Sequence, residues 1–407
     1  MNLRPYQTDI SNRGAAIVHE RGLVYLAMET RTGKTFTALT IAHLCGARNV
    51  LFITKLKIKP SIETDYKACG YGFRMTCTNY EQVHNMPRDF DFVIIDEAHS
   101  LSAFPKPSLR ALRIKAAYFH LPMVFLSGTP TPESYSGIYH QLWVSARSPF
   151  KTYNNFYLWA LSFVNKKMDI INGHSVINYD DANREAINAH IAPLMLHYTQ
   201  QEAGFNCPVN EHFVIVDDPQ LPALTRQLFK DRRLTFDQGE VIADTPAKLM
   251  GKMHQLSSGT CILDNDSRII ISRMKAEEIK RQFVGKRIAI FYKFILEFNV
   301  LREAFGEAVT ESAEEFQANP DRVFLSQIQS GREGIALHFA DALIYYSIDY
   351  SAVSYWQSRA RIQALSRDTA ANIYWVFTKG GIEPKIYKAV SSKKDFTLSW
   401  FMRHGGI

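Results

Sequence analysis

The sequence predicts an α/β protein with two tandem parallel-sheet lobes and a mainly helical, aromatic-rich insertion at the end of the first lobe. Three observations support this prediction: the length, the apolar runs that alternate with helical patterns, and the polar motifs that follow these runs. At 407 residues the chain is long enough for two or three cores. We expect the first lobe at 1–205 with its insertion at 135–200, a linker at 206–211 and the second lobe at 212–407.

Composition favours a globular protein with a polyanionic partner. Hydrophobic residues make up 46% of the chain and charged residues 21%, and the formal net charge is +7. The five cysteines are scattered and form no CxxC pair, so neither a disulfide framework nor a zinc site is indicated. No apolar run approaches membrane-spanning length. We therefore expect a cytoplasmic protein without a membrane partner.

The first motif is METRTGKT, residues Met28 to Thr35, between an apolar run at 23–26 and a helical pattern at 36–45. A strand, a tight loop, Gly-Lys-Thr and a helix are the context of a Walker A phosphate loop. Lys34 would then reach the β- and γ-phosphates, and the Thr35 hydroxyl would ligate Mg²⁺. The remaining expected nucleotide-binding positions of the loop are Thr30, Thr32 and Gly33.

Upstream of this loop, Leu3-Arg4-Pro5-Tyr6-Gln7 opens a helical pattern that runs towards Glu20. A glutamine just before a phosphate loop can offer its amide to both the donor and the acceptor edge of adenine. We count Gln7 and Arg4 among the expected nucleotide-binding residues. The alternative is a polar residue on an N-terminal helix.

An acidic motif follows the stretch FDFVIID at 90–96, whose apolar centre is typical of a buried parallel strand. The strand ends in Asp96-Glu97-Ala98-His99, a DEAH box. Asp96 would hold the Mg²⁺ shell, and Glu97 would orient and deprotonate the attacking water. The alternative is a chance tetrapeptide at a surface turn.

Three further strand ends carry hydroxyl or ammonium groups. The strand at 50–54 ends in Thr54-Lys55, and a similar end at 76–79 carries Thr78 and Asn79; both can contact a phosphodiester backbone. The strand at 123–126 ends in Ser127-Gly128-Thr129-Pro130, which can link the phosphate site to the rest of the protein. Solvated loops and ordinary turns are the alternatives.

The insertion is dense in aromatics and contains an expected hairpin at 169–176 with an Asn172-Gly173 turn. The second lobe repeats strands and helices without a Gly-Lys-Thr loop of its own. Its strands are expected at 212–216, 286–292, 322–326, 342–348 and 373–377. Arginines in YWQSRARIQ, residues 355–363, can stabilise charge on a transferring phosphoryl group bound to the first lobe. The alternative is a basic surface helix.

The ordered set LRPYQ, TGKT, DEAH, SGTP, SGREGI and QSRAR resembles superfamily 2 helicases and translocases. Within that group it resembles the Snf-type branch, including small bacteriophage-encoded members, and the resemblance spans Leu3 to about Arg367. It implies two RecA-like lobes, ATP and Mg²⁺. By the same resemblance, residues that couple the ATP state to lobe movement are His99, Ser127 and Thr129, and residues at the interface between lobes are Gly331, Glu333 and Gly334.

Gln357 and Arg361 match the last motif of the family, in which arginine contacts the γ-phosphate. The second arginine of that motif is replaced here by Ala364, and Arg359 or Arg367 is a possible substitute. The loop has Thr30-Arg31-Thr32 where Snf-type members usually have Met-Gly-Leu. The expected catalytic residues are Lys34, Asp96, Glu97, Gln357, Arg359 and Arg361.

The function implied is an ATP-dependent motor on DNA, single-stranded, duplex or branched, in phage replication, recombination or repair, acting as a monomer in the host cytoplasm. Strand separation and translocation alone are both open. An RNA helicase and a non-motor ATP-gated clamp are the alternatives. The expected nucleic-acid contacts are Thr54, Lys55, Thr78, Asn79, Tyr292, Gln329 and Ser330.

Overall fold

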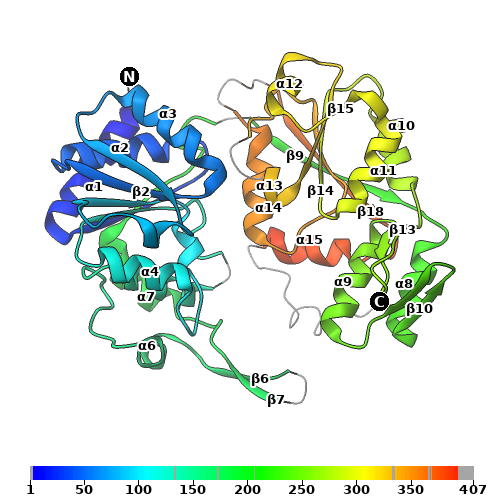
Figure 1. Cartoon of the computed structure of the whole chain (residues 1–407), viewed down its shortest axis with the longest axis horizontal. Helices are drawn as coiled ribbons and strands as arrows, with labels where there is room; N and C mark the ends of the chain where they lie inside the picture. Colours follow the sequence, from blue (N-terminus) through cyan, green and yellow to red (C-terminus); the bar gives the residue numbers. More distant parts are fainter. Residues whose placement is uncertain are drawn as a thin grey trace. The chain divides into compact units, whose positions relative to one another are not determined.

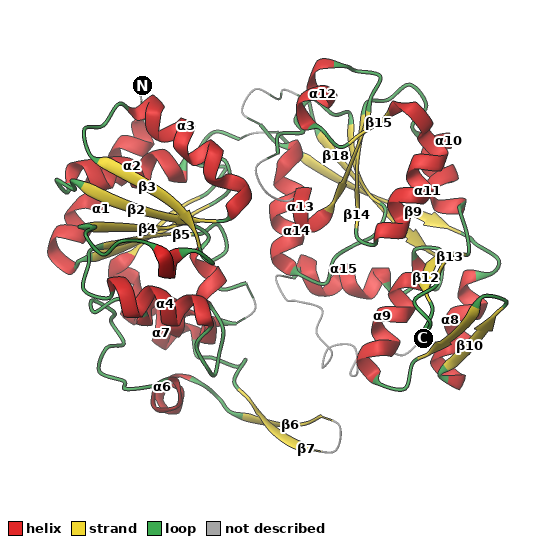
Figure 2. Cartoon of the chain, viewed as in Figure 1, coloured by secondary structure: helices red, strands yellow, loops and turns green. Residues whose placement is uncertain are grey.

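The computed structural model describes residues 3–132, 134–171, 174–205, 207–331, 335–364, 367 and 369–392. The chain divides into two compact units, Met1–Gly204 and Phe205–Ile407. Each unit is built on one six-stranded parallel sheet with helices on both faces (Figures 1 and 2). The predicted α/β class with two RecA-like lobes is therefore confirmed.

The sheet of the first lobe has the strand order β3-β2-β4-β5-β1-β8, and every neighbouring pair is parallel. Its strands are β1 Leu23–Met28, β2 Asn49–Thr54, β3 Arg74–Asn79, β4 Phe92–Ile95, β5 Met123–Leu126 and β8 Met195–Tyr198. Its helices are α1 Pro5–Arg21, α2 Lys34–Leu44, α3 Lys59–Cys69, α4 Leu109–Tyr118, α5 Ile138–Trp143, α6 Phe156–Phe163 and α7 Arg184–Ile191.

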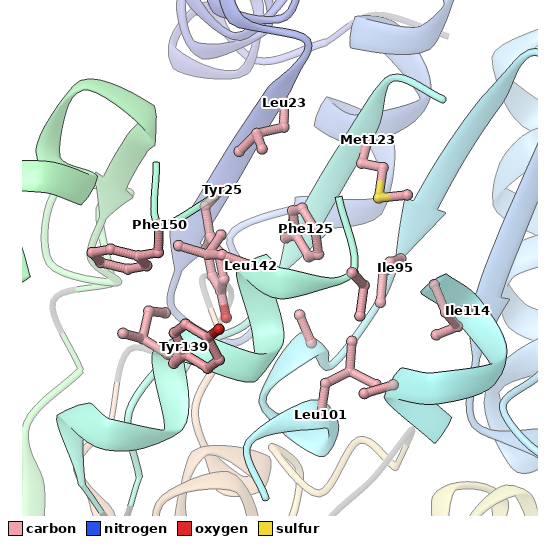
Figure 3. Close-up of a cluster of buried hydrophobic side chains, with 14 of the residues drawn as sticks. Leu23, Tyr25, Ile95, Leu101, Ile114, Met123, Phe125, Tyr139, Leu142 and Phe150 are labelled. Carbon is pink, nitrogen blue, oxygen red and sulfur yellow. The ribbon is translucent and has the colours of Figure 1, made fainter. Parts of the chain in front are cut away.

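The central strands are continuous apolar runs because both faces of the sheet are buried. Residues alternate between two clusters: Val24 and Phe52 pack with helices α1, α2 and α3, whereas Tyr25, Leu51 and Phe125 pack with α4 to α7. Figure 3 shows part of the second cluster, between β1, β5 and α5. Parallel strands place all of their carboxyl ends at one edge, where the motif residues meet.

Two features of the insertion bear on the expectations from sequence. The predicted hairpin is confirmed as β6 Lys167–Ile171 paired antiparallel with β7 His174–Asn178, and its turn lies outside the described residues. The short strand β8 was not anticipated; it pairs with β1 and completes the sheet edge. A strand of four residues is too short for its sequence pattern to be recognised, and it forms because it pairs with a parallel neighbour.

The sheet of the second lobe has the order β15-β16-β14-β17-β18-β9, also parallel throughout. Its strands are β9 Val209–Val216, β14 Ile288–Tyr292, β15 Val309–Thr310, β16 Val323–Gln327, β17 Ala342–Tyr345 and β18 Ala371–Thr378. Two antiparallel hairpins accompany it, β10 Arg233–Phe236 with β11 Gly239–Ile242, and β12 Thr260–Ile262 with β13 Arg268–Ile270.

The helices of this lobe are α8 Leu221–Asp231, α9 Pro246–Ser257, α10 Met274–Gln282, α11 Ile295–Phe305, α12 Ala313–Ala318, α13 Ile328–Gly331, α14 Ala352–Arg359 and α15 Glu383–Ser391. Strand β9 begins at Val209, inside the segment expected as a linker, because it pairs with β18 along its whole length. Across the described ranges, no helix is long and apolar enough to cross a membrane.

Candidate functional site

The phosphate loop, 29–33, connects buried strand β1 to helix α2, which begins at Lys34. Two loop residues have left-handed backbones, Arg31 with φ 65° and Gly33 with φ 83°. Arg31 therefore adopts a backbone conformation that residues with a Cβ rarely adopt. It turns the loop at a position where Snf-type members usually carry glycine. The first N–H groups of α2 are free of intrahelical acceptors and suit an anion.

The Lys34 ammonium folds over this loop. It donates hydrogen bonds to the carbonyl oxygens of Met28 at 3.0 Å and Glu29 at 3.1 Å. Its charge also acts on Asp96, whose pKa it lowers. A cation on a phosphate loop, with a carboxylate near enough to feel its charge, suits a metal-bound triphosphate. Thr35 follows in the first turn of α2 and is half-buried.

Helix α1 packs against the loop through Tyr6 and Gln7. The Tyr6 hydroxyl donates to the carbonyl oxygen of Thr32 at 3.0 Å, and Gln7 Oε1 accepts from the Arg4 N–H at 2.9 Å. A Cβ added at Gly33 would lie 1.9 Å from Gln7 Nε2, so only glycine fits at that position. Gln7 is thus buried against the phosphate loop, and its expected contact with adenine stays a prediction.

Residues that follow β8 hold the other side of the loop. Gln200 Nε2 donates to the Thr30 carbonyl oxygen at 3.0 Å, and the Gln200 N–H donates to the Glu29 carboxylate at 2.7 Å. Tyr198 stacks on Tyr6 with ring centroids 4.4 Å apart. Sequence analysis placed this segment at the end of the insertion and missed its role, since 171 residues separate Gln200 from Glu29.

The acidic pair lies at the end of β4, where both side chains are largely buried. Thr54 Oγ1 donates to Asp96 Oδ2 at 2.7 Å, and the Tyr80 hydroxyl donates to the Asp96 carbonyl oxygen. Burial, and next the charge of Glu97, raise the pKa of Asp96 to about 6, against the opposing effects of Thr54 and Lys34. A divalent cation beside Asp96 would favour its charged form.

Glu97 adopts a left-handed backbone, φ 51°, which directs the chain from the strand into the next turn. His99 Nδ1 lies 3.3 Å from Glu97 Oε2 and 2.9 Å from Ser127 Oγ. Ser127 Oγ in turn accepts from the Thr129 N–H at 3.0 Å. The structure therefore brings the three residues expected to act in coupling into one hydrogen-bonded group beside Glu97.

This edge of the first lobe thus combines a cation, an anion-binding helix N-terminus and two carboxylates. Oxygen donors such as the Asp96 carboxylate and the Thr35 hydroxyl are the ligands that Mg²⁺ prefers, so these residues fit the expected metal. Glu97 is placed to accept a proton from water. The arrangement suits hydrolysis of a metal-bound nucleotide.

Four of the expected nucleic-acid contacts are buried within their own lobes. Thr54 is fully buried, and Thr78, Asn79 and Tyr292 are 3%, 8% and 7% exposed. The Thr54 hydroxyl donates to Asp96, and its expected contact with nucleic acid stays a prediction. Asn79 Oδ1 accepts from the Gln82 N–H at 2.9 Å and shapes the following turn.

The other expected nucleic-acid contacts are more accessible. Lys55 and Ser330 are half-buried, and Gln329 is exposed. They lie just after β2 and in α13, which follows β16. Contact with nucleic acid through these side chains stays a prediction.

The arginine-bearing segment of the second lobe consists of α14 and the turn that follows it. Arg359 forms an ion pair with Glu211 at 2.5 Å. Arg367 donates to four backbone carbonyl oxygens, those of His338, Ala340, Thr369 and Ala370. Both candidates to replace the arginine missing at Ala364 therefore have binding partners inside their own lobe.

Arg361 and Gln357, the residues that match the family motif, lie on the same segment. Gln357 is 2% exposed, and the Arg361 carbonyl oxygen accepts from the Leu337 N–H at 3.0 Å. At Gly331, an added Cβ would lie 2.3 Å from the Phe291 ring, so close packing requires glycine. Glu333 and Gly334 lie outside the described residues.

Comparison with known proteins gives partial matches. A stretch of 79 residues is 34% identical to the DNA repair and recombination protein RAD54B of Gallus gallus, and one of 86 residues is 31% identical to the chromatin-remodeling ATPase INO80 of Pyricularia oryzae. These stretches cover 19% and 21% of this chain but only 9% and 4% of the relatives. No protein-family model matches the chain. The partial matches support a relation to the Snf2-type ATPases of helicase superfamily 2.

Proposed function

We propose that this protein is a nucleic-acid-dependent ATPase that moves along or remodels DNA. One observation carries the proposal: the phosphate loop with Lys34 and the buried pair Asp96 and Glu97 follow strands of one parallel sheet, at the same edge. The names of the partial relatives, a DNA repair and recombination protein and a chromatin-remodeling ATPase, support a motor that acts on DNA.

In the proposed reaction Lys34 and the N–H groups of α2 bind the phosphates. Asp96 and Thr35 would hold Mg²⁺, which would neutralise charge on the phosphates. Glu97 accepts a proton from water as the water oxygen forms a bond to the γ-phosphorus. The bond from that phosphorus to the bridging oxygen breaks, which releases phosphate and ADP. Arg361 is the proposed arginine that stabilises the transferring group, because it matches the last motif of the family.

The proposal is tested by steady-state ATPase measurements of the wild type and of Glu97→Gln. We expect Glu97→Gln to lower kcat by about 10²- to 10⁴-fold, the usual contribution of a positioned general base, while ATP still binds. Glu185→Gln, the same change at an exposed position of α7, is the matched control. Wild-type turnover in Glu97→Gln would show that the base is wrongly assigned.

The substrate is tested by comparing ATPase stimulation by single-stranded, duplex and forked DNA and by RNA at matched salt. We expect DNA to stimulate turnover, and the stimulation to fall as salt rises, because phosphate contacts release counterions. Stimulation by RNA but not by DNA would show that RNA is the partner. An ATPase rate that no nucleic acid changes would contradict the proposed motor activity.

A further inference from the structure

The side chain of Gln141 in α5 joins three segments of the first lobe. It is fully buried. Its Oε1 accepts from the Tyr25 hydroxyl at 2.7 Å, and its Nε2 donates to Ser102 Oγ and to the Pro130 carbonyl oxygen, both at 2.7 Å. Tyr25 lies in the strand that leads to the phosphate loop. Ser102 and Pro130 follow the acidic motif and the Ser-Gly-Thr motif, respectively.

The orientation of this carboxamide follows from Pro130. A carbonyl oxygen can only accept a hydrogen bond, so the amide nitrogen of Gln141 must face it and the amide oxygen must face Tyr25. The Tyr25 hydroxyl then has to donate its single proton to Gln141. Figure 3 shows the Tyr25 side chain extending from β1 towards the α5 residues Tyr139 and Leu142.

The groups beside Glu97 lie next to this site. Burial raises the pKa of Tyr25, and Ser127 opposes the rise. Ser127 Oγ accepts from the Thr129 N–H at 3.0 Å and lies 2.9 Å from His99 Nδ1. His99 Nδ1 in turn lies 3.3 Å from Glu97 Oε2.

We propose that Gln141 is a positioning residue of the ATPase site, which holds the segments that follow β1, β4 and β5 in place and so sets the position of Glu97. The proposal rests on the proposed function. Close packing supports it, since a Cβ added at Gly137 in the same region would lie 2.9 Å from the Ser102 side chain.

The test uses Tyr25→Phe, which removes one hydroxyl and keeps the ring in the core, together with Gln141→Leu and the double variant. Tyr139→Phe is the matched control, because its buried hydroxyl donates to the Tyr153 carbonyl oxygen at 3.1 Å, outside this hydrogen-bonded series. We expect Tyr25→Phe to lower kcat about tenfold with an unchanged KM for ATP, and the control to retain wild-type kcat. Coupled residues lose activity non-additively, so the double variant should match the worse single variant.

Hydrogen exchange gives a second readout that does not need turnover. Gln141→Leu and Tyr25→Phe should both raise amide exchange in 97–102 and 127–131, whereas Tyr139→Phe should not. Wild-type kcat in Tyr25→Phe, or strictly additive losses, would overturn the inference while the proposed function stands. A wild-type protein without ATPase activity would overturn the proposed function. Even then, hydrogen exchange tests the inference, because unchanged exchange of these two segments in the variants would overturn it.

Discussion

The two lobes use the carboxyl edges of similar sheets in different ways. In the first lobe the groups that follow β1 and β4, Lys34 and the pair Asp96 and Glu97, combine a cation and two carboxylates around a phosphate loop. In the second lobe Lys293 follows β14, and its ammonium is paired with Asp349 at 2.9 Å and lies 3.6 Å from the Tyr350 ring centroid. There the charges bind one another.

A second ion pair makes the contrast sharper. Lys275 and Glu383 form a bridge whose side chains are 2% and 0% exposed. Lys275 Nζ also donates to the Tyr346 carbonyl oxygen at 2.9 Å, and the Glu383 carboxylate accepts from the Thr378 N–H at 2.8 Å. The first lobe therefore groups its charges around a phosphate loop, whereas the second lobe pairs its charges with one another. Substitutions should therefore affect turnover in the first lobe and stability in the second.

The largest effect is expected at Glu383. Glu383→Leu leaves the Lys275 ammonium buried without its counter-charge, which should lower the free energy of unfolding of this lobe by about 3–5 kcal/mol. The double variant Lys275→Met, Glu383→Leu should recover most of that loss, because well-packed apolar side chains can replace a buried pair. Denaturant titration, monitored by amide hydrogen exchange in β18, measures the stability of the single and the double variant. A single variant as stable as the wild type would refute the assigned role.

Lys34→Ala should have the next largest effect, on activity and not on folding. Loss of one charge-stabilising donor typically lowers kcat by about 10²- to 10³-fold. Lys379→Ala is the control, because its pair with Asp217 is exposed on both sides, at 62% and 69%. ATPase assays measure turnover in both variants, and thermal unfolding measures their stability. If Lys34→Ala unfolded at a much lower temperature, the lysine would have a structural role like those of the second lobe.

The third effect is a pH dependence of stability. Burial raises the pKa of Glu383 from 4.5 to about 7, although Lys275 opposes the rise. The folded state thus binds the proton more tightly than the unfolded state. The contribution to stability is complete below pH 4.5 and is lost as pH rises through 7, by about 3 kcal/mol.

The unfolding free energy of the wild type, minus that of the double variant Lys275→Met, Glu383→Leu, isolates this contribution across the pH range. We expect the difference to fall as pH rises. A difference that grows with pH would show that attraction to Lys275 outweighs burial.

The smallest effect is expected at Glu211. Its carboxylate accepts from Trp375 Nε1 at 2.9 Å and from the Tyr387 hydroxyl at 2.7 Å, besides the ion pair with Arg359. Glu211→Gln keeps one acceptor oxygen, but it removes the charge and turns the other oxygen into a donor, so about 1–2 kcal/mol of stability should be lost. Thermal unfolding measures it, with Glu240→Gln, at the pair of half-buried Glu240 with Arg233, as the control. A loss above about 3 kcal/mol would mean that the charge itself holds α14.

Local sequence patterns predicted the elements that carry their own signal. The apolar runs that became β2, β4 and β5 are bounded by polar motifs, and the hairpin was recognisable from the Asn172-Gly173 pair in the sequence. The ordered motifs also placed Lys34 and the acidic pair at one sheet edge. Strand β8 and the hairpins β10–β11 and β12–β13 were missed, because such short strands depend on a partner distant in sequence.

The same limit applies to the site. At Thr54 the sequence alone does not show whether the hydroxyl faces solvent or a neighbouring carboxylate, because a hydroxyl at a strand end looks the same in both cases. Gln141 and Glu211 carried no signal, because the partners that they bind lie as far away as 116 and 176 residues, respectively.

The sequence by itself determined the two parallel-sheet lobes and the residue types at the end of each strand, because periodicity and motif order are local properties of the chain. Only the tertiary structure decided which of those side chains meet. Hydrogen bonds such as Tyr25 to Gln141 and ion pairs such as Lys275 to Glu383 form between segments that share no pattern. Folding brings them together, and burial then makes each pairing obligatory, since a buried polar group without a partner costs free energy.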